Sequence, residues 1–386
     1  MSAYIPLSVP TFNGNEDKYV KECIDTEWVS SAGKYVDLFE KKIADYTRSK
    51  YAIACVNGTS ALQVSLRLVG VKPNDEVIVP TLTFIAPINA IAYNGATPLF
   101  MDCDDFCNID PEKVEQFIKE ETIFQNGNTY NKITRNKISA IIPVHIWGNL
   151  CSFDDLIRLC EERNIQVVED ASESLGSFYK DGNYAGRHSG TVGKIGCISF
   201  NGNKIITTGG GGMILTDDNE LAEKAKYFTT QAKDDPVRYV HNEIGYNFRL
   251  TNIHAALGVA QLEQLPTILK KKKFIHNFYK SGIQNEKGIS IMGIPNYSKS
   301  NHWLNLIKFD RSLVDQDIDQ IIRKLEMNKI QSRPIWKLNH EQKPYQKNQN
   351  FFIEKAKKMV KCYLCIPSSP NLNEEDLNRI LNHLNE

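Results

Sequence analysis

The residue types best suited to covalent chemistry in this chain are a lysine and an acid near a run of glycines. Lys204 follows a short apolar stretch and precedes Gly209–Gly212, and Asp170 ends another apolar stretch 34 positions before the lysine. Glycines have no side chain, so the backbone there can approach a bound molecule closely. Most lysines are solvated at the surface, so a lysine in this setting is a candidate for chemistry.

An amine and a carboxylate in this arrangement meet the requirements of pyridoxal phosphate. The lysine would form an imine with the cofactor aldehyde, and the acid would keep the pyridine nitrogen protonated, so that the ring accepts electrons. Asp170 stands at the carboxyl end of an expected strand, where ligands bind in parallel sheets. Glu169 and Glu173 lie beside it, and three neighbouring acids favour a cation among them. The alternative for Asp170 is a helix cap.

A second strand end carries residue types that bind phosphate. Gly58, Thr59 and Ser60 join an expected strand to an expected helix, so they present amides and hydroxyls at a helix N-terminus. Ser199, on the strand before the lysine, is a further candidate for this phosphate. The alternative for the first three is ordinary helix capping. The sequence contains no GxGxxG or GxxxxGK[ST] motif that would indicate a dinucleotide or a Walker site.

Two ring side chains follow other expected strands. Phe84 is suited to stacking on a flat heteroaromatic ring, with core packing as the alternative. His145 ends an apolar run, and we interpret it as a buried structural histidine rather than an acid–base group.

The apolar pattern predicts an α/β protein with two domains. Through the first 260 residues, near-continuous apolar strands alternate with helices, which is typical of a mostly parallel sheet covered on both faces. We predict a large domain over 1–261 and a smaller α+β domain over 262–386, with N-terminal residues that pack against the smaller one. The segment 119–137 breaks the rhythm and is expected to be an exposed insertion, such as a hairpin. The expected strands are 51–56, 76–79, 97–101, 139–144, 166–168 and 303–309, and the main expected helices are 60–68, 84–93, 153–163, 265–279 and 316–327.

The bulk composition excludes several classes of protein. The 46 basic and 46 acidic residues give a formal net charge of zero, which argues against a nucleic-acid binder. No stretch approaches about 20 apolar residues, and the N-terminus lacks the pattern of a signal peptide, so we expect a cytoplasmic protein without a membrane span. Nine scattered cysteines are typical of reduced core residues. The pair Cys362 and Cys365 has no partners for a metal site, so no metal is expected.

These residues together give the chain a family resemblance over nearly its whole length. It resembles the DegT/DnrJ/EryC1/StrS family, which comprises fold-type I aminotransferases that use pyridoxal phosphate and act on nucleotide-linked keto sugars. The resemblance is carried by NGTSAL (57–62), TFIAPINA (83–90), VVEDASESLGS (167–177), SFNGNKIITTGGGGM (199–213) and GYNFRLTNIHAALG (245–258). It implies a large domain with a mostly parallel seven-stranded sheet between helices, followed by a smaller C-terminal α+β domain.

The resemblance also implies a role for individual residues. Lys204 would be the Schiff-base lysine, Asp170 the partner of the pyridine nitrogen, and Phe84 the stacking ring. The implied phosphate ligands are Gly58, Thr59 and Ser199. Such enzymes are homodimers with shared active sites, and Asn247 would reach the cofactor phosphate of the neighbouring subunit. Many relatives carry Gln or His at the position of Glu173, which would orient the cofactor's phenolic oxygen or a sugar hydroxyl.

Three further stretches are similar to those of the legionaminic-acid-pathway aminotransferases: WVSSAG (28–33), the insertion at 119–137 and RPIWKLNH (333–340). That similarity implies transfer of an amino group from L-glutamate to C4 of a UDP-linked 4-keto-6-deoxy-N-acetylhexosamine. The candidate contacts to the nucleotide-linked keto sugar are Trp28, Ser30, Glu173, Arg249, Arg333, Lys337 and His340.

Three alternatives remain. A GDP-perosamine synthase shares the chemistry and differs in the nucleotide and in the C2 substituent. A sugar 3-dehydratase of similar fold carries His in place of the lysine, so Lys204 argues against it. A non-catalytic regulatory protein that binds pyridoxal phosphate would not need the intact set of Lys204, Asp170 and the phosphate loop.

Overall fold

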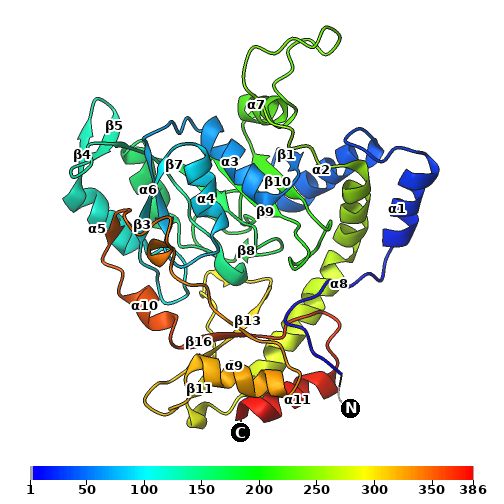
Figure 1. Ribbon diagram of the computed structural model, residues 1–386, viewed down its shortest axis with the longest axis vertical. Coiled ribbons are helices and arrows are strands. Elements are labelled where there is room, and N and C mark those ends of the chain that lie inside the picture. Colours follow the sequence, from blue (N-terminus) through cyan, green and yellow to red (C-terminus); the bar gives the residue numbers. More distant parts are fainter. Residues whose placement is uncertain (1–2, 386) are drawn as a thin grey trace.

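A ten-stranded sheet forms the centre of the larger of two units (Figure 1). The computed structural model describes residues 3–385. Along the main path of the sheet, the strands are β1 (Tyr51–Cys55), β10 (Gly212–Thr216), β9 (Ile195–Ser199), β7 (Gln166–Asp170), β6 (Lys137–Ile141), β2 (Glu76–Pro80), β3 (Thr97–Met101) and β15 (Asn350–Phe351). Neighbouring strands are parallel, except that β10 is antiparallel to both β1 and β9. The seven strands from β1 to β3 therefore form the predicted mostly parallel sheet.

The predicted insertion at 119–137 is a hairpin at the rim of this sheet. β4 (Thr122–Gln125) pairs antiparallel with β5 (Asn128–Asn131), and β5 continues the sheet beside β6. The prediction of a hairpin is confirmed.

Helices cover both faces of the sheet because its strands are apolar on both sides. In β1, Ile53 and Cys55 face one core while Ala52 and Ala54 face the other, as the two-residue period of a strand requires. One face carries α3 (Gly58–Leu68), α4 (Ala86–Tyr93) and α7 (Asn219–Thr229). The other carries α2 (Lys34–Thr47), α5 (Pro111–Glu121), α6 (Asp154–Glu162) and the first half of α8 (Asn252–Gly282). α1 (Glu16–Asp25) packs against α8.

The long helix α8 joins the larger unit to the smaller one (Figure 1). The predicted division at residue 262 falls inside this helix. The smaller unit has an antiparallel sheet in the order β11 (Ile289–Ile291), β13 (Asn305–Phe309), β16 (Tyr363–Ile366) and β14 (Arg333–Pro334). Its helices are α9 (Ile318–Met327), α10 (Lys355–Met359) and α11 (Glu374–Asn385).

Segments distant in sequence connect the two units. Ile5, near the N-terminus, is buried in the core of the smaller unit. Conversely, β15 belongs to the C-terminal part of the sequence but pairs with β3 of the large sheet. A further small sheet pairs β8 (Phe178–Tyr179) with β12 (Ser298–Lys299).

The loop that follows α7 projects from the body of the larger unit (Figure 1). Isolated bridges pair Thr230 with Asn247 at its base and Asp235 with Val240 near its tip. Its exposed large apolar side chains are Val237, Tyr239, Val240 and Ile244.

All nine cysteines are free, and all but Cys362 are buried, as expected for core residues. Within residues 3–385, the structure has no helix with both the length and the apolar character needed to cross a bilayer. The same residues contain no cluster of three His, Cys, Asp or Glu side chains able to hold a metal ion.

Candidate active site

The ends of β7 and β9 and the turns after β1 and β2 meet around a pocket of about 300 Å³. This is the carboxyl edge of the parallel strands, where ligands of such sheets bind. Seven of the residues predicted from the sequence line this pocket: Gly58, Thr59, Phe84, Asp170, Glu173, Ser199 and Lys204.

The amine of Lys204 lies between an acid and an aromatic face. Its Nζ is 3.6 Å from Oε1 of Glu173 and 4.3 Å from the centroid of the Trp303 ring. Both groups attract an ammonium. The lysine side chain is 13% exposed and that of the glutamate 5%, so the amine faces the pocket rather than bulk water.

Glu173 is an acid with few partners. Burial raises its pKa to about 7, and neither the charge of Lys204 nor the hydrogen bond from Trp147 reverses this. The backbone N–H of Trp147 donates to Oε2 of Glu173 at 2.8 Å. A carboxyl group with this pKa can take up or release a proton near neutral pH.

Asp170 is held rigidly at the end of β7. Its backbone N–H donates to the carbonyl of Pro143 at 2.9 Å, and its own carbonyl accepts from the N–H of His145 at 3.0 Å. One carboxylate oxygen accepts from the N–H of Ser172 at 3.0 Å. The other has no protein partner within residues 3–385, so it is free to accept from a protonated ring nitrogen.

The turn between β1 and α3 forms a glycine cradle at the N-terminus of α3. A Cβ at position 58 would lie 2.8 Å from Cβ of Ser199, so only glycine allows the helix N-terminus to approach β9 this closely. Asn57 caps the helix by accepting from the N–H of Ser60 at 2.8 Å. Thr59 and Ser199 line the pocket, whereas Ser60 does not. The helix cap is therefore Asn57, and Ser60 takes part in capping.

Aromatic rings form another part of the pocket wall. Phe84 is 53% exposed, and its ring centroid lies 6.3 Å from that of Trp336. Trp336 in turn stacks on Trp147 at 5.0 Å. Our sequence interpretation missed Trp336 and Trp303, although both line the pocket. Trp336 lies between the predicted sugar contacts Arg333 and Lys337, but no local pattern indicated that this ring folds back onto the larger unit.

His145 is a structural histidine, as predicted. It is fully buried, and its Nε2 lies 2.8 Å from Oε2 of Glu169. Because Nδ1 accepts from the N–H of Cys151 at 3.1 Å, the ring proton is on Nε2 and is donated to Glu169. His145 does not line the pocket.

The remaining predicted residues lie outside this pocket, so their roles stay predictions: Trp28, Ser30, Asn247, Arg249, Arg333, Lys337 and His340. His340 is engaged elsewhere, with Nδ1 2.7 Å from Oγ1 of Thr81. Asn247 accepts a hydrogen bond from Nε of Arg249 at 3.1 Å, at the base of the projecting loop.

The pocket residues fit pyridoxal phosphate. They provide an amine for its aldehyde, an unpaired carboxylate oxygen for its ring nitrogen and a glycine cradle with hydroxyls for its phosphate. An exposed aromatic ring is available for its face.

The comparisons with known proteins agree with this chemistry. The sequence pattern of the DegT/DnrJ/EryC1/StrS aminotransferase family matches residues 10–385. The chain is 37% identical over 387 residues to the GDP-perosamine synthase of Escherichia coli O157:H7, covering 99% of this chain and 98% of that protein. It is 36% identical over 388 residues to EpsN of Bacillus subtilis (strain 168), whose name describes a pyridoxal phosphate-dependent aminotransferase, covering 99% of this chain and 95% of EpsN.

Among solved structures, Helicobacter pylori PseC, an aminotransferase involved in the biosynthesis of pseudoaminic acid, superimposes with a TM-score of 0.88. It is 25% identical, and the match covers 99% of this chain and 98% of PseC. The sequence pattern, the relatives and the pocket lead to one conclusion. The chain belongs to the DegT/DnrJ/EryC1/StrS aminotransferase family, and its cofactor is pyridoxal phosphate.

Proposed function

We propose that this aminotransferase moves the amino group of L-glutamate to C4 of a nucleotide-linked 4-keto-6-deoxy sugar. The first candidate acceptor is UDP-4-keto-6-deoxy-N-acetylglucosamine, which would give UDP-4-amino-4,6-dideoxy-N-acetylglucosamine for a surface glycan or nonulosonic acid. The observation that carries the proposal is the pair of Lys204 and Glu173, 3.6 Å apart in a pocket that also contains Asp170 and the glycine cradle.

The geometry of the pocket supports the following proposed cofactor contacts. Pyridoxal phosphate, when bound, supplies an electron sink for the carbon that carries the amino group. The unpaired oxygen of Asp170 would hold the proton of the ring nitrogen. Gly58, Thr59 and Ser199 would hold the phosphate, and Phe84 would cover one face of the ring.

Lys204 and Glu173 would move the proton. An amine must lose its proton before it can act as a base, and a carboxylate 3.6 Å away can accept that proton. Burial keeps the pKa of Glu173 close to 7, so this carboxyl group can also return the proton when Lys204 acts as the acid. The indole of Trp303 excludes water from one side of the amine.

The projecting loop supports a second copy of the chain as the partner. Its exposed apolar side chains, with Val237 and Ile244 each 80% exposed, favour burial against another protein surface. We propose a homodimer in which Asn247 reaches the cofactor phosphate of the other subunit. Asn247→Ala should then weaken cofactor retention by about tenfold, the cost of one hydrogen bond to a charged group. Fluorescence titration with pyridoxal phosphate measures this, and an unchanged affinity would contradict the shared site.

A second candidate acceptor is favoured by the relatives. The Escherichia coli protein at 37% identity and the Caulobacter vibrioides protein at 36% are both named GDP-perosamine synthase. GDP-4-keto-6-deoxymannose would undergo the same chemistry at C4, so only the nucleotide and the C2 substituent distinguish it from the first candidate.

A substrate comparison tests these assignments. The purified protein is incubated with L-glutamate and with each of the two keto sugars, and the formation of 2-oxoglutarate is followed. Turnover with only the UDP sugar supports the first candidate, and turnover with only the GDP sugar supports the second. Turnover with neither would refute the proposed substrate class. Lys204→Ala is the matched blank for spontaneous reaction.

A further inference from the structure

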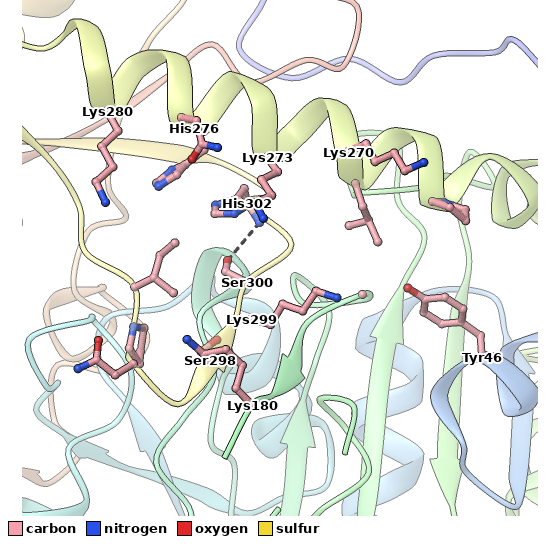
Figure 2. Close-up of a pocket in the computed structure, with 17 residues that line it drawn as sticks. Tyr46, Lys180, Lys270, Lys273, His276, Lys280, Ser298, Lys299, Ser300 and His302 are labelled. Carbon is pink, nitrogen blue, oxygen red and sulfur yellow. Dashed lines mark hydrogen bonds between the residues drawn. The ribbon is translucent and has the colours of Figure 1, made fainter. Parts of the chain in front are cut away.

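A second, larger pocket of about 740 Å³ lies between α8 and the segment 294–302. Figure 2 shows α8 along one side of this pocket, with Lys180, Lys299 and Ser300 on the segments across from it. The pocket shares no lining residue with the candidate active site. It is therefore a separate site, and its ligand need not be the aminotransferase substrate.

The charged side chains of this basic pocket are all cationic. Lys270, Lys273 and Lys280 lie on one face of α8, at the spacing that aligns helical side chains. Lys180 and Lys299 add two further positive charges from the other side, and no Asp or Glu lines the pocket. This concentration contrasts with the zero net charge of the whole chain.

Among the side chains that the structure describes, these five lysines have no counter-ions. Every salt bridge within residues 3–385 involves other cations, and no side-chain hydrogen bond engages these amines. Lysines that face one another across a concave surface repel, so an anion placed between them would be attracted by several charges at once. The pocket is thus electrostatically prepared for an anionic ligand.

The wall of the pocket also contains polar side chains. Ser298 is 3% exposed, and its hydroxyl has no hydrogen-bond partner within the described residues. The imidazoles of His276 and His302 stack 4.2 Å apart. Burial lowers the pKa of His302 to about 3 and also lowers that of His276, so both rings are neutral at pH 7. The positive charge of the pocket comes from the lysines alone.

The pocket is larger than an inorganic ion requires, and part of its wall is apolar. Small-molecule sites have volumes of about 300–1,000 Å³ and combine apolar surface with a few polar groups. Here Tyr46, Pro266, Leu269 and Ile294 supply the apolar surface. Lysine ammoniums are compact point charges that bind phosphate oxygens. We propose that the basic pocket binds a small organic diphosphate, with its phosphates among the lysines and its uncharged part on the apolar wall.

Calorimetric titration of the protein saturated with pyridoxal phosphate tests this proposal. The probes are inorganic pyrophosphate, uridine diphosphate and citrate. The variant Lys273→Gln/Lys299→Gln removes one lysine from each side of the pocket. The matched control, Lys41→Gln/Lys224→Gln, removes two exposed lysines that do not line the pocket. All four lysines are exposed, so the melting temperatures of both variants should match that of the wild type.

We expect saturable binding of pyrophosphate that weakens by about tenfold in the pocket variant and by less than about twofold in the control. Uridine diphosphate should bind more tightly than pyrophosphate if the apolar wall holds the organic part, and this advantage should be lost in the pocket variant. The absence of saturable binding would overturn the proposal. Equal weakening in both variants, or tighter binding of citrate than of pyrophosphate, would overturn it as well.

Discussion

Glu169 and Glu173 stand four residues apart, both buried, in opposite surroundings. The carboxylate of Glu169 accepts hydrogen bonds from the ring of His145 and from the backbone N–H groups of Gly190, Val192 and Gly193. Burial alone would raise its pKa, but these donors hold the pKa below the usual value. Glu173 has one backbone donor and the amine of Lys204, and burial raises its pKa to about 7.

The difference separates an acid that maintains the fold from one available for chemistry. Four donors fix Glu169 as a permanent anion that ties β7 to the loop before β9. Glu173 has unused capacity to accept and a proton affinity near neutrality, and it faces a pocket. Acids of equal burial therefore have different roles because they have different numbers of donors.

The largest effect on activity should come from replacing Lys204, which pairs with Glu173. Lys204→Ala removes the amine that we propose carries the proton, so turnover should fall by about 10³-fold or more. Stability should change little, because Glu173 can take up a proton when its cation is removed. The assay is the formation of 2-oxoglutarate from L-glutamate, with Lys224→Ala as a control for a surface lysine. Full activity in Lys204→Ala would contradict the proposal that Glu173, unlike Glu169, takes part in the chemistry through Lys204.

Replacing Glu169 should lower the stability of the fold rather than the activity. Glu169→Gln replaces one acceptor oxygen by an NH₂ group. This donor would then face the backbone N–H groups that donate to Glu169 in the wild type. We expect a loss of about 3 kcal/mol, because buried donors lose a charged partner. Urea unfolding at a fixed protein concentration measures this loss. A change below about 0.5 kcal/mol would show that the network around His145 does not stabilise the fold.

The smallest effect is a difference in how stability depends on pH. An unfolded glutamate titrates near pH 4.3. Since the folded pKa of Glu173 is about 7, the folded state binds more protons between these values, and stability falls as the pH rises through this range. Between pH 5 and the folded pKa, stability should fall by at most about 3 kcal/mol, from about 1.4 kcal/mol for each of about two pH units.

Variants of the two acids should therefore respond differently between pH 5 and pH 8. For Glu173→Gln, the stability of the variant relative to the wild type should rise as the pH rises. For Glu169→Gln, the difference should stay flat in this range, because the folded pKa of Glu169 is lowered and its contribution is lost only below about pH 4. Urea unfolding of the cofactor-free protein at several pH values measures both. A flat difference for Glu173→Gln would contradict the raised pKa.

Local patterns in the sequence predicted the half of the site that lies on the parallel sheet. A glycine run, a strand-end acid and a glycine turn each reflect a local backbone requirement, so Lys204, Asp170 and Gly58 could be placed before the fold was known. The rings of Trp303 and Trp336 could not, because they reach the pocket only through the packing of the smaller unit. β15 was missed for the same reason, since its two residues form a strand only beside β3. The pairing of two segments distant in sequence cannot be predicted from the local sequence pattern of either segment alone.

The covalent role of Lys204 is the central claim. The protein is incubated with pyridoxal phosphate, reduced with borohydride and digested, and the modified peptide is identified by mass spectrometry. We predict one stoichiometric adduct on the peptide that contains Lys204, and none in Lys204→Ala. An adduct on another lysine of the wild type, or no adduct at all, would contradict the account.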